Sequence, residues 1–336
     1  MSAQARDSAR KRGGAGRGKP RAESHLVPRL KRLPPGLWML LLLMAVFSIA
    51  TDNYFDRNNW RNILVQSVPL MILSFSQTLI VLTQGTDLSL GAQVSLVTVV
   101  WVWLANRGVN IYLSAGAAVV VVVGIGALNG LLVSKGRIPP FIATFGTQNV
   151  VMSMALLLTS GSSIYHYHPI FESVMETRVA GIVPLPVVVA ACSFAVTWVL
   201  LYRTRFGTNI FGLGGNQEAL SLAGVSIARS YIKTYAYAGF LAGICGLVTT
   251  CRVESGQPIV GMGWEFEAVA ATLLGGTSLR EGHGGVSGTI IGVLLLVVLR
   301  NGLNVSGISA MYQNAIIGSI VMLAIVIDAL VRRGRD

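Results

Sequence analysis

The feature that most constrains this chain is a series of apolar runs, each close in length to a membrane crossing. Crossing the roughly 30 Å hydrocarbon core takes about 20 mainly apolar residues in a helix. The sequence is 53% hydrophobic and 12% charged, whereas soluble domains carry about 25% charged residues. We therefore predict an all-α fold, a polytopic membrane helix bundle with about ten transmembrane helices. The predicted spans are 36–51, 63–83, 89–106, 111–133, 139–159, 185–202, 231–251, 264–279, 286–304 and 312–331.

The charges outside these runs predict how the bundle is oriented. Residues 1–34 hold ten of the 26 basic residues, and we expect a disordered cytoplasmic arm that is attracted to anionic lipid heads. Nucleic-acid binding is disfavoured, because no aromatic residues are interleaved with these charges. Cytoplasmic loops are rich in Lys and Arg, and ten spans place both termini in the cytoplasm, with Lys135, Arg137 and Arg203 inside. Arg300, near the outer end of the ninth span, does not fit this pattern.

The predicted transmembrane domain, 35–332, contains stretches that repeat at one offset. NGLLVS at 129–134 recurs as NGLNVS at 301–306, and 83–97 aligns at the same offset with 255–269, with weaker identity. An offset of five spans inverts the second copy relative to the first. Inverted repeats of this kind build a central pathway between two halves, with broken helices near the midplane. We predict two inverted five-helix repeats, at about 36–160 and about 185–332.

Residues 203–230 form a long predicted cytoplasmic loop. Gly212, Gly214 and Gly215 are expected to break any structure that precedes them. Asn216 is a predicted N-cap, and Gly224 can close the short helix that follows. From the residues alone, this helix either packs on lipid at the interface or docks in a groove on a partner protein.

A second glycine-rich segment has glycines every four residues, at Gly284, Gly288 and Gly292. This spacing predicts one helix face that allows close backbone contact with another helix. The polar stretch before it is expected to be a cytoplasmic turn or to line a cavity. His283, within that stretch, is assigned no catalytic role.

Polar residues at the ends of the apolar runs, or within them, are the candidates for a solute pathway. A carboxylate near the bilayer should face water or a partner, so Asp87 either lines a pathway or caps the third span, and the two roles are compatible. Amide side chains both donate and accept hydrogen bonds, as an uncharged hydroxylated solute requires, although bonding between helices is their default role. The candidate pathway residues are Gln84, Asp87, Ser89, Gln148, Asn149, Glu265, Glu267, Gln313 and Asn314.

Several functions are disfavoured by what the sequence lacks. The stretch GGAGRGKP at 13–20 has Pro20 where a phosphate-binding loop needs Ser or Thr, so we expect no ATP site in this chain. Cys192, Cys245 and Cys251 have no metal-ligand spacing, and no metal site is predicted. Acid–base pairs suited to proton or sodium coupling are scarce, and no constellation for a membrane enzyme is evident.

Four stretches together carry a family resemblance: QGTDLSLGA (84–92), GGNQEALSLAGVSI (214–227), LLGGTSLREGHGGVSGTIIG (273–292) and NGLNVSGISAMYQNAIIGSIVMLAIVID (301–328). On these stretches the chain resembles the permease subunits of ribose/xylose/galactoside-type sugar ABC importers, over most of its length after Pro34. The usual Gly-Gly-Ile-Asp of that family is here Gln84-Gly85-Thr86-Asp87, so its acid is retained. A usual Gly-Asn-Asn run is here Gly214-Gly215-Asn216.

The resemblance implies a bacterial inner-membrane permease that translocates a monosaccharide (a pentose, a hexose or a related polyol) by alternating access. It implies a homodimer or heterodimer, a periplasmic sugar-binding protein, and a separate cytoplasmic ATPase that binds ATP and Mg. This chain would then be no enzyme and hold no cofactor. The two alternatives are a permease for branched-chain amino acids and an ion-coupled secondary transporter. The implied ATPase-docking residues are Gly215, Asn216, Gln217, Glu218, Ala219, Leu220, Leu222, Ala223 and Gly224.

Overall fold

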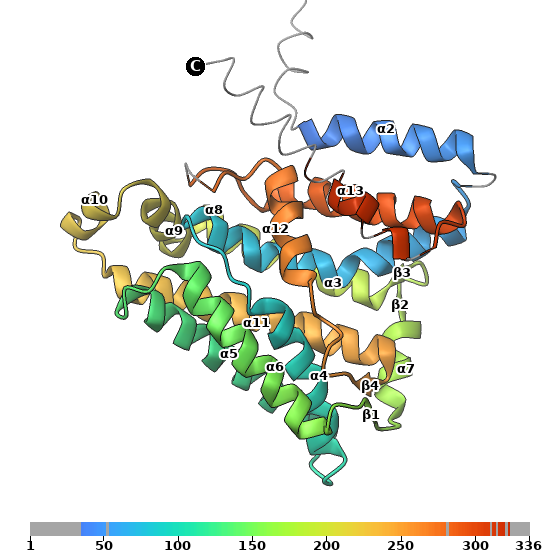
Figure 1. The fold of residues 1–336 in the computed structure, drawn as a ribbon, viewed down its shortest axis with the longest axis horizontal. Coiled ribbons are helices and arrows are strands. Elements are labelled where there is room, and N and C mark those ends of the chain that lie inside the picture. The colour runs from blue at the N-terminus through green and yellow to red at the C-terminus, as the bar shows by residue number, and fades with distance from the viewer. Residues whose placement is uncertain are drawn as a thin grey trace, which may run out of the picture. The chain divides into compact units, whose positions relative to one another are not determined.

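The computed structural model describes residues 35–51, 54–279, 282–309, 311–313, 315–319 and 322, which form helices almost throughout (Figure 1). The arm predicted at 1–34 and most of the tenth span predicted at 312–331 lie outside the described residues. The helices are α2 (Pro35–Ala50), α3 (Arg57–Leu82), α4 (Leu90–Ala105), α5 (Ile111–Ser134), α6 (Pro140–Thr159), α7 (Pro169–Glu176), α8 (Leu185–Arg203), α9 (Arg205–Gly215), α10 (Gln217–Leu222), α11 (Ile227–Val253), α12 (Trp264–Leu274) and α13 (Val286–Val305).

Two small antiparallel ribbons are the strands of the described part of the chain. β1 (Ile164–Tyr165) pairs with β4 (Ser255–Gly256), and β2 (Arg178–Val179) pairs with β3 (Val183–Pro184). Each strand has only two residues, so the fold remains that of a helix bundle. The first ribbon fixes the segment before α7 to the end of α11.

Six of the described helices are long and apolar enough to cross a membrane: α3, α5, α6, α8, α11 and α13. α2 and α4 are apolar but shorter, and α12 has only 11 residues. The prediction of a span at 264–279 was therefore too long. The helix ends at Leu274 because Gly276 adopts a φ of +88°, a left-handed conformation that terminates helices. The coarser prediction of a membrane helix bundle is confirmed, whereas the count of ten spans stays a prediction.

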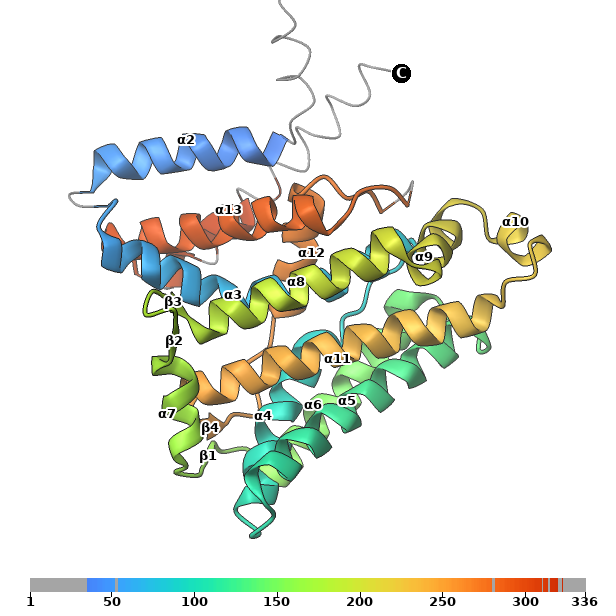
Figure 2. The same ribbon diagram turned by 180° about the vertical axis from the view of Figure 1, so that it is seen from behind.

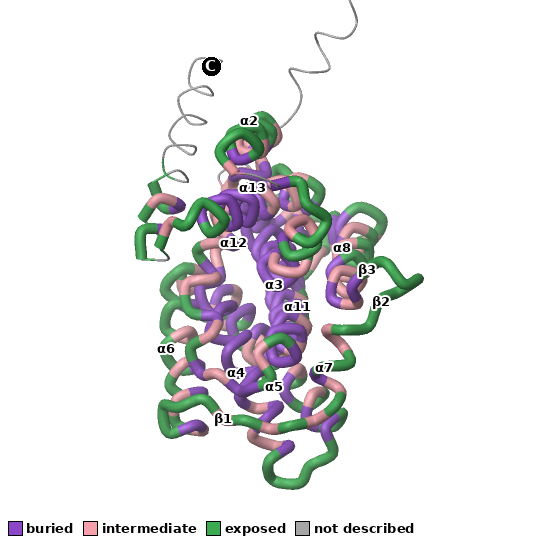
Figure 3. Tube along the Cα trace, turned by 90° about the vertical axis from the view of Figure 1, so that its right-hand side faces the viewer, coloured by how far each residue is buried: buried purple, intermediate pink, exposed green. Residues whose placement is uncertain are grey.

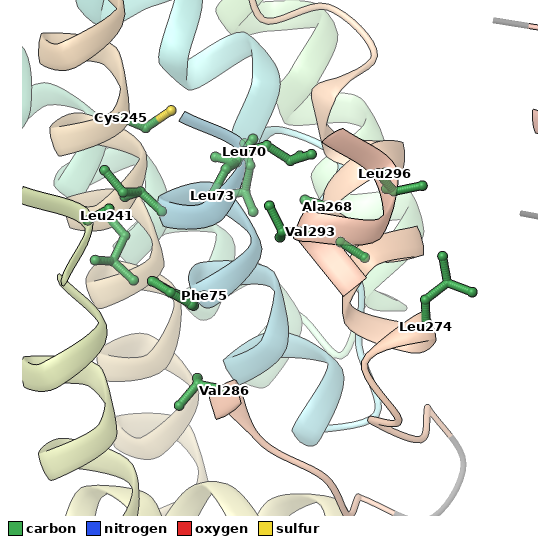
Figure 4. Close-up of a cluster of buried hydrophobic side chains, with 14 of the residues drawn as sticks. Leu70, Leu73, Phe75, Leu241, Cys245, Ala268, Leu274, Val286, Val293 and Leu296 are labelled. Atoms are coloured by element: carbon green, nitrogen blue, oxygen red, sulfur yellow. The ribbon is translucent and has the colours of Figure 1, made fainter. Parts of the chain in front are cut away.

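Burial separates central helices from peripheral ones (Figure 3). Within their most apolar 18-residue windows, α3, α13 and α11 are 78%, 67% and 61% buried, against 28%, 28% and 22% for α5, α6 and α8. Apolar side chains on the peripheral helices suit a lipid solvent. Figure 4 shows Leu70, Leu73 and Phe75 of α3 between α11 on one side and α12 with α13 on the other.

Glycines allow the central helices to approach one another closely, which matters because lipid supplies little hydrophobic drive for helix association. A Cβ on Gly288 would lie 2.0 Å from the carbonyl oxygen of Gly275, and one on Gly292 would lie 1.9 Å from that of Ala271. Both glycines thus lie where α13 meets α12. Gly284 precedes α13 and has a φ of +131°. Of the three glycines that were expected on one helix face, two are therefore helical.

The same element order occurs twice at the offset found in the sequence. Shifted by the 172 residues that separate Asn129 from Asn301, α3, α4 and α5 fall on α11, α12 and α13 to within three residues at each end. Contacts also correspond, since α3 packs on α11, α12 and α13, and α11 packs on α3, α4 and α5. Each half therefore places a long helix, a break and a short helix in matching positions.

Candidate functional site

The breaks between the long and short helices bring the two halves into backbone contact. One break, 83–89, separates α3 from α4, and the other, 254–263, separates α11 from α12. A Cβ on Gly91 would lie 2.3 Å from the Gly261 carbonyl oxygen, and one on Gly261 would lie 2.2 Å from that of Gly91. Non-helical backbone at membrane depth must be buried in protein or line a cavity. The breaks are therefore the natural place to look for a site.

Asp87 sits at the centre of the first break and is fully buried. Its Oδ1 accepts hydrogen bonds from the Ser89 amide at 2.8 Å and the Ser89 hydroxyl at 2.6 Å. Bonding to the backbone two residues ahead makes an Asx turn, which leads into α4 at Leu90. With its amide oriented so that both atoms find partners, Gln77 donates to the Asp87 carbonyl oxygen at 3.2 Å and accepts from the Asp87 amide at 3.3 Å. In this conformation Asp87 organises the break.

Ser89 connects this turn to two neighbouring helices. Its Oγ accepts hydrogen bonds from Gln93 Nε2 and from Asn129 Nδ2, each at 2.8 Å. Thr147 Oγ1 on α6 donates to Asn129 Oδ1 at 2.7 Å. The network therefore joins the break to α4, α5 and α6 through hydroxyl and amide groups of the kind that specify one arrangement of a buried core.

Three buried polar atoms near this network have no hydrogen-bond partner among the described residues: Asp87 Oδ2, Gln93 Oε1 and the Tyr235 hydroxyl. Tyr235 approaches the break, since a Cβ on Gly85 would lie 3.2 Å from its hydroxyl oxygen. An unpaired buried polar group costs about 1–3 kcal/mol. The groups that bond to Ser89 are thus paired with one another, whereas Asp87 Oδ2, Gln93 Oε1 and the Tyr235 hydroxyl can each form a further hydrogen bond.

Glu265, the second residue of α12, lies just after the second break and is 1% exposed. Its Oε1 accepts from the Gly263 amide at 3.2 Å and from Gln148 Nε2 of α6 at 2.9 Å. Its Oε2 lies against Gly91, where a Cβ would be 2.1 Å away. Glu265 therefore fixes the start of α12 while touching the start of α4, and Gln148 joins it there.

Glu267 and Arg300 form an ion pair with a separation of 2.7 Å between Glu267 Oε1 and an Arg300 guanidinium nitrogen. This pair gives a reason for Arg300, which the charge pattern of the sequence left unexplained. The side chains of Arg300 and Glu267 are 37% and 26% exposed. The pair links the N-terminal part of α12 to the C-terminal part of α13.

We predict that Arg300→Gln lowers the free energy of unfolding by only about 0.5–1 kcal/mol, because partly exposed ion pairs contribute little. The measurement is a double-mutant cycle with Glu267→Gln in thermal unfolding of the purified protein. A coupling energy above about 3 kcal/mol would contradict this prediction and would indicate that another chain covers the pair.

The remaining pathway candidates lie apart from these two clusters. Asn149 is exposed on α6 and donates to the Phe145 carbonyl oxygen of its own helix at 2.8 Å. Gln313 donates to Asn304 Oδ1 at 2.7 Å and to the Ile308 carbonyl oxygen at 2.8 Å. Asn314 lies outside the described residues. The structure therefore gathers Asp87 and Ser89 in one cluster and Gln148 and Glu265 in another, with Gln84 at the edge of the first break.

Sequence reasoning missed four residues of the central network: Gln93, Asn129, Thr147 and Tyr235. The internal repeat carried a signal for two of them. Asn129 belongs to the repeated NGLLVS motif, and Gln93 aligns with Glu265 at the same offset. A polar residue that recurs at matching positions of two halves is a good marker of a site at their interface. Thr147 and Tyr235 had no comparable signal.

The predicted cytoplasmic loop at 203–230 contains two helices, α9 and α10, which we call together the docking segment. It lies at the end of the bundle opposite to α7, β1 and β4 (Figures 1 and 2). Asn216 is the N-cap of α10 as predicted, and its Oδ1 accepts from the Ala219 amide at 2.9 Å. α10 contains no buried residue, and Leu222 is 84% exposed. Gly224, with a φ of +80°, follows the helix.

Gly212 and Gly214 do not break the preceding structure, so the expectation was wrong for these two. Both lie within α9, which ends at Gly215. A Cβ on Gly214 would lie 1.9 Å from the Leu82 carbonyl oxygen, and one on Gly212 would lie 2.8 Å from the Leu220 side chain. These two glycines permit close contact with α3 and α10, and packing offsets their low helix propensity.

A hollow of about 300 Å³ lies at the other end of the bundle, between β1, α7 and the end of α11. Its lining includes Tyr165, His166, His168, Phe171 and Glu254. Tyr165 is 73% exposed, and the His166 and His168 rings are stacked with centroids 6.4 Å apart. Each imidazole already has a partner, since His166 Nδ1 contacts Asn106 Oδ1 and His168 Nδ1 accepts from the Ile170 amide.

Comparison with known proteins places this architecture in a family. A family model described as branched-chain amino acid transport system / permease component matches residues 59–326. The ribose import permease protein of Escherichia coli is 36% identical over 293 residues, covering 86% of this chain and 91% of the relative. The D-allose transport system permease protein of Escherichia coli is 32% identical over 298 residues, covering 88% and 91%.

A galactose/methyl galactoside import permease protein of Haemophilus influenzae is also 32% identical, over 311 residues that cover 87% of this chain and 93% of the relative. No solved structure matches the chain at a significant level. The resemblance inferred from the four sequence stretches is thereby confirmed over nearly the whole length of both partners. This chain belongs to the family of transport-system permease components that includes the bacterial sugar import permeases.

Proposed function

We propose that this chain is the membrane-spanning permease subunit of an ATP-driven importer for a monosaccharide. The observation that carries the proposal is the identity of 32–36% with permeases named for ribose, D-allose and galactose, over at least 86% of this chain. The amide- and hydroxyl-rich clusters around Ser89 and Gln148 suit an uncharged hydroxylated solute. The chain is a transport subunit and not an enzyme, and ATP hydrolysis belongs to a separate ATPase.

The partners follow from the same family membership. An ATPase supplies the driving force, and a binding protein delivers the sugar. We place the ATPase on Gly215–Gly224, because this segment projects from the bundle without burying a residue of α10. That end of the bundle is then cytoplasmic, which agrees with the basic residues Lys135, Arg137, Arg203 and Arg205 near it.

The pathway is proposed to run beside the paired breaks, at the Gln148–Glu265 contact, with a second permease copy completing it. Asn149 is exposed on α6 among exposed apolar residues such as Phe145 and Val150. A polar amide facing lipid is unfavourable, whereas a second copy packed on α6 would enclose it. Alternating access would then use the two repeats, whose matching element order and reciprocal contacts support an inverted duplication.

The proposal is tested by reconstitution with the ATPase and the binding protein of the same organism in proteoliposomes. We expect uptake of radiolabelled ribose, D-allose or galactose that requires ATP and all three proteins. Leucine serves as the control solute, because the family model is described by branched-chain amino acids. Uphill sugar transport by this chain alone under an ion gradient would overturn the proposal. Uptake of leucine, with no uptake of any of the three sugars, would overturn it as well.

A further inference from the structure

Gln84, a candidate pathway residue from the sequence, connects the first break to the docking segment. It has a φ of +62°, and its Nε2 donates to the Gly214 carbonyl oxygen at the end of α9 at 2.6 Å. The Cα of Gly214 packs directly on the end of α3, since a Cβ there would lie 1.9 Å from the Leu82 carbonyl oxygen. Backbone and side-chain contacts thus hold the end of α9 to the start of the break.

A second connection runs from α10 to the same break. Gln217, the first residue of α10, donates from Nε2 to the Tyr231 hydroxyl at 2.8 Å. The Tyr231 ring packs near that of Tyr235, one turn further along α11, with centroids 6.5 Å apart. The Tyr235 hydroxyl lies at Gly85, next to Gln84. Both routes therefore end within the segment that holds Asp87.

The docking segment is itself held together as one unit. The Leu220 side chain of α10 packs on Gly212 of α9, which has no Cβ to oppose it. The two helices are joined at Asn216, whose side chain caps α10 and whose amide donates to the Gly212 carbonyl oxygen at 3.0 Å. A force applied to exposed α10 would be passed to α9 and from there to α3.

We propose that Gln84 and Tyr231 are coupling residues: through their hydrogen bonds to Gly214 and Gln217, movement of the docking segment repositions the break that carries Asp87. This inference rests on the proposed function, because it assumes an ATPase that moves the docking segment. Both residues act through other groups and are positioning residues. The break can change conformation in response to this movement, since its backbone is held by side-chain hydrogen bonds that can exchange partners.

The test uses the complete transporter in proteoliposomes and measures sugar uptake and ATP hydrolysis in the same sample. Gln84→Gly removes the amide at a position whose positive φ suits glycine. Gln84→Glu keeps the size, but its ionised carboxylate cannot donate to a carbonyl. Tyr231→Phe removes only the hydroxyl. Tyr237→Phe is the matched control, because it removes a similar hydroxyl contact on α11, with Thr197 at 3.0 Å, outside both routes.

We expect each of the three coupling variants to keep the ATPase bound and to lower uptake per ATP hydrolysed by about threefold to tenfold, the size expected for one lost hydrogen bond. Tyr237→Phe should leave that ratio unchanged. A merely structural role would lower the unfolding temperature and both activities together, and that result overturns the inference, as does an unchanged ratio in the coupling variants. Absence of ATP-driven uptake in the unsubstituted transporter would instead overturn the proposed function.

Discussion

Asp87→Ala is expected to lower the free energy of unfolding of the permease by about 3 kcal/mol or more, because two donors lose their acceptor in a buried site. The Ser89 amide and hydroxyl both bond to Asp87 Oδ1, and the same hydroxyl holds Gln93 and Asn129. A loss of this size corresponds to a fall of about 6–12 °C in unfolding temperature for a domain of 150–250 residues. The loss of transport that we expect in this variant would then result from disorder in the first break, 83–89.

The measurement is thiol labelling during heating of the detergent-solubilised permease. Cys245 and Cys251 are buried, whereas Cys192 is exposed, so a Cys192→Ser background reports unfolding alone. The matched control is Asp56→Ala, which removes an exposed aspartate that caps α3 through the Asn58 amide at 2.9 Å and should cost only about 1 kcal/mol. An equal, small effect of both changes would contradict the role given to Asp87.

Asp87→Asn separates the structural role from a role of the charge. The amide oxygen can still accept from Ser89, so we expect stability within about 1 kcal/mol of the native chain. Transport by this variant then reports on the carboxylate itself. Stability retained with transport lost would indicate that the acid takes part in transport, in addition to organising the break.

The membrane class and most helices were predictable, because they depend on local composition. Runs of about 20 apolar residues are read directly from the sequence, and α5 at Ile111–Ser134 lies within one residue of its predicted span. α12 was predicted five residues too long, because its end is set by the left-handed Gly276 and by Gly275, which packs on Gly288 of α13. The sequence contains both glycines but shows neither the backbone angle of the one nor the helix that the other meets.

The candidate site was predictable in kind but not in arrangement. Asp87, Ser89 and Glu265 were identified as polar residues in an apolar setting, and each lies at a helix break. The sequence could not tell that Gln84 would turn away toward Gly214, because that depends on the approach of α9 to α3. Likewise, Arg300 looked misplaced until its contact with Glu267, 33 residues earlier, was known.

The docking segment gives the sharpest test of how this chain obtains energy. Leu222→Asp combined with Glu218→Lys is expected to abolish ATP-driven uptake, with a loss of more than about tenfold, and to release the ATPase during purification. Truncating a hot-spot residue of a protein interface costs about 2 kcal/mol or more. The fold should be unaffected, because no residue of α10 is buried.

Three measurements distinguish the outcomes: unfolding temperature, co-purification of the ATPase, and uptake. Ile182→Asp is the matched control, since Ile182 is a 68% exposed apolar residue at the end of the bundle that carries α7, and it should leave the ATPase bound. If the docking variant stays folded and still transports sugar at the native rate, the segment 215–224 is not where the ATPase binds. Release of the ATPase from a folded permease would mean that force enters through α10, of whose six residues five are exposed, and reaches the membrane through the contacts of α9 with α3.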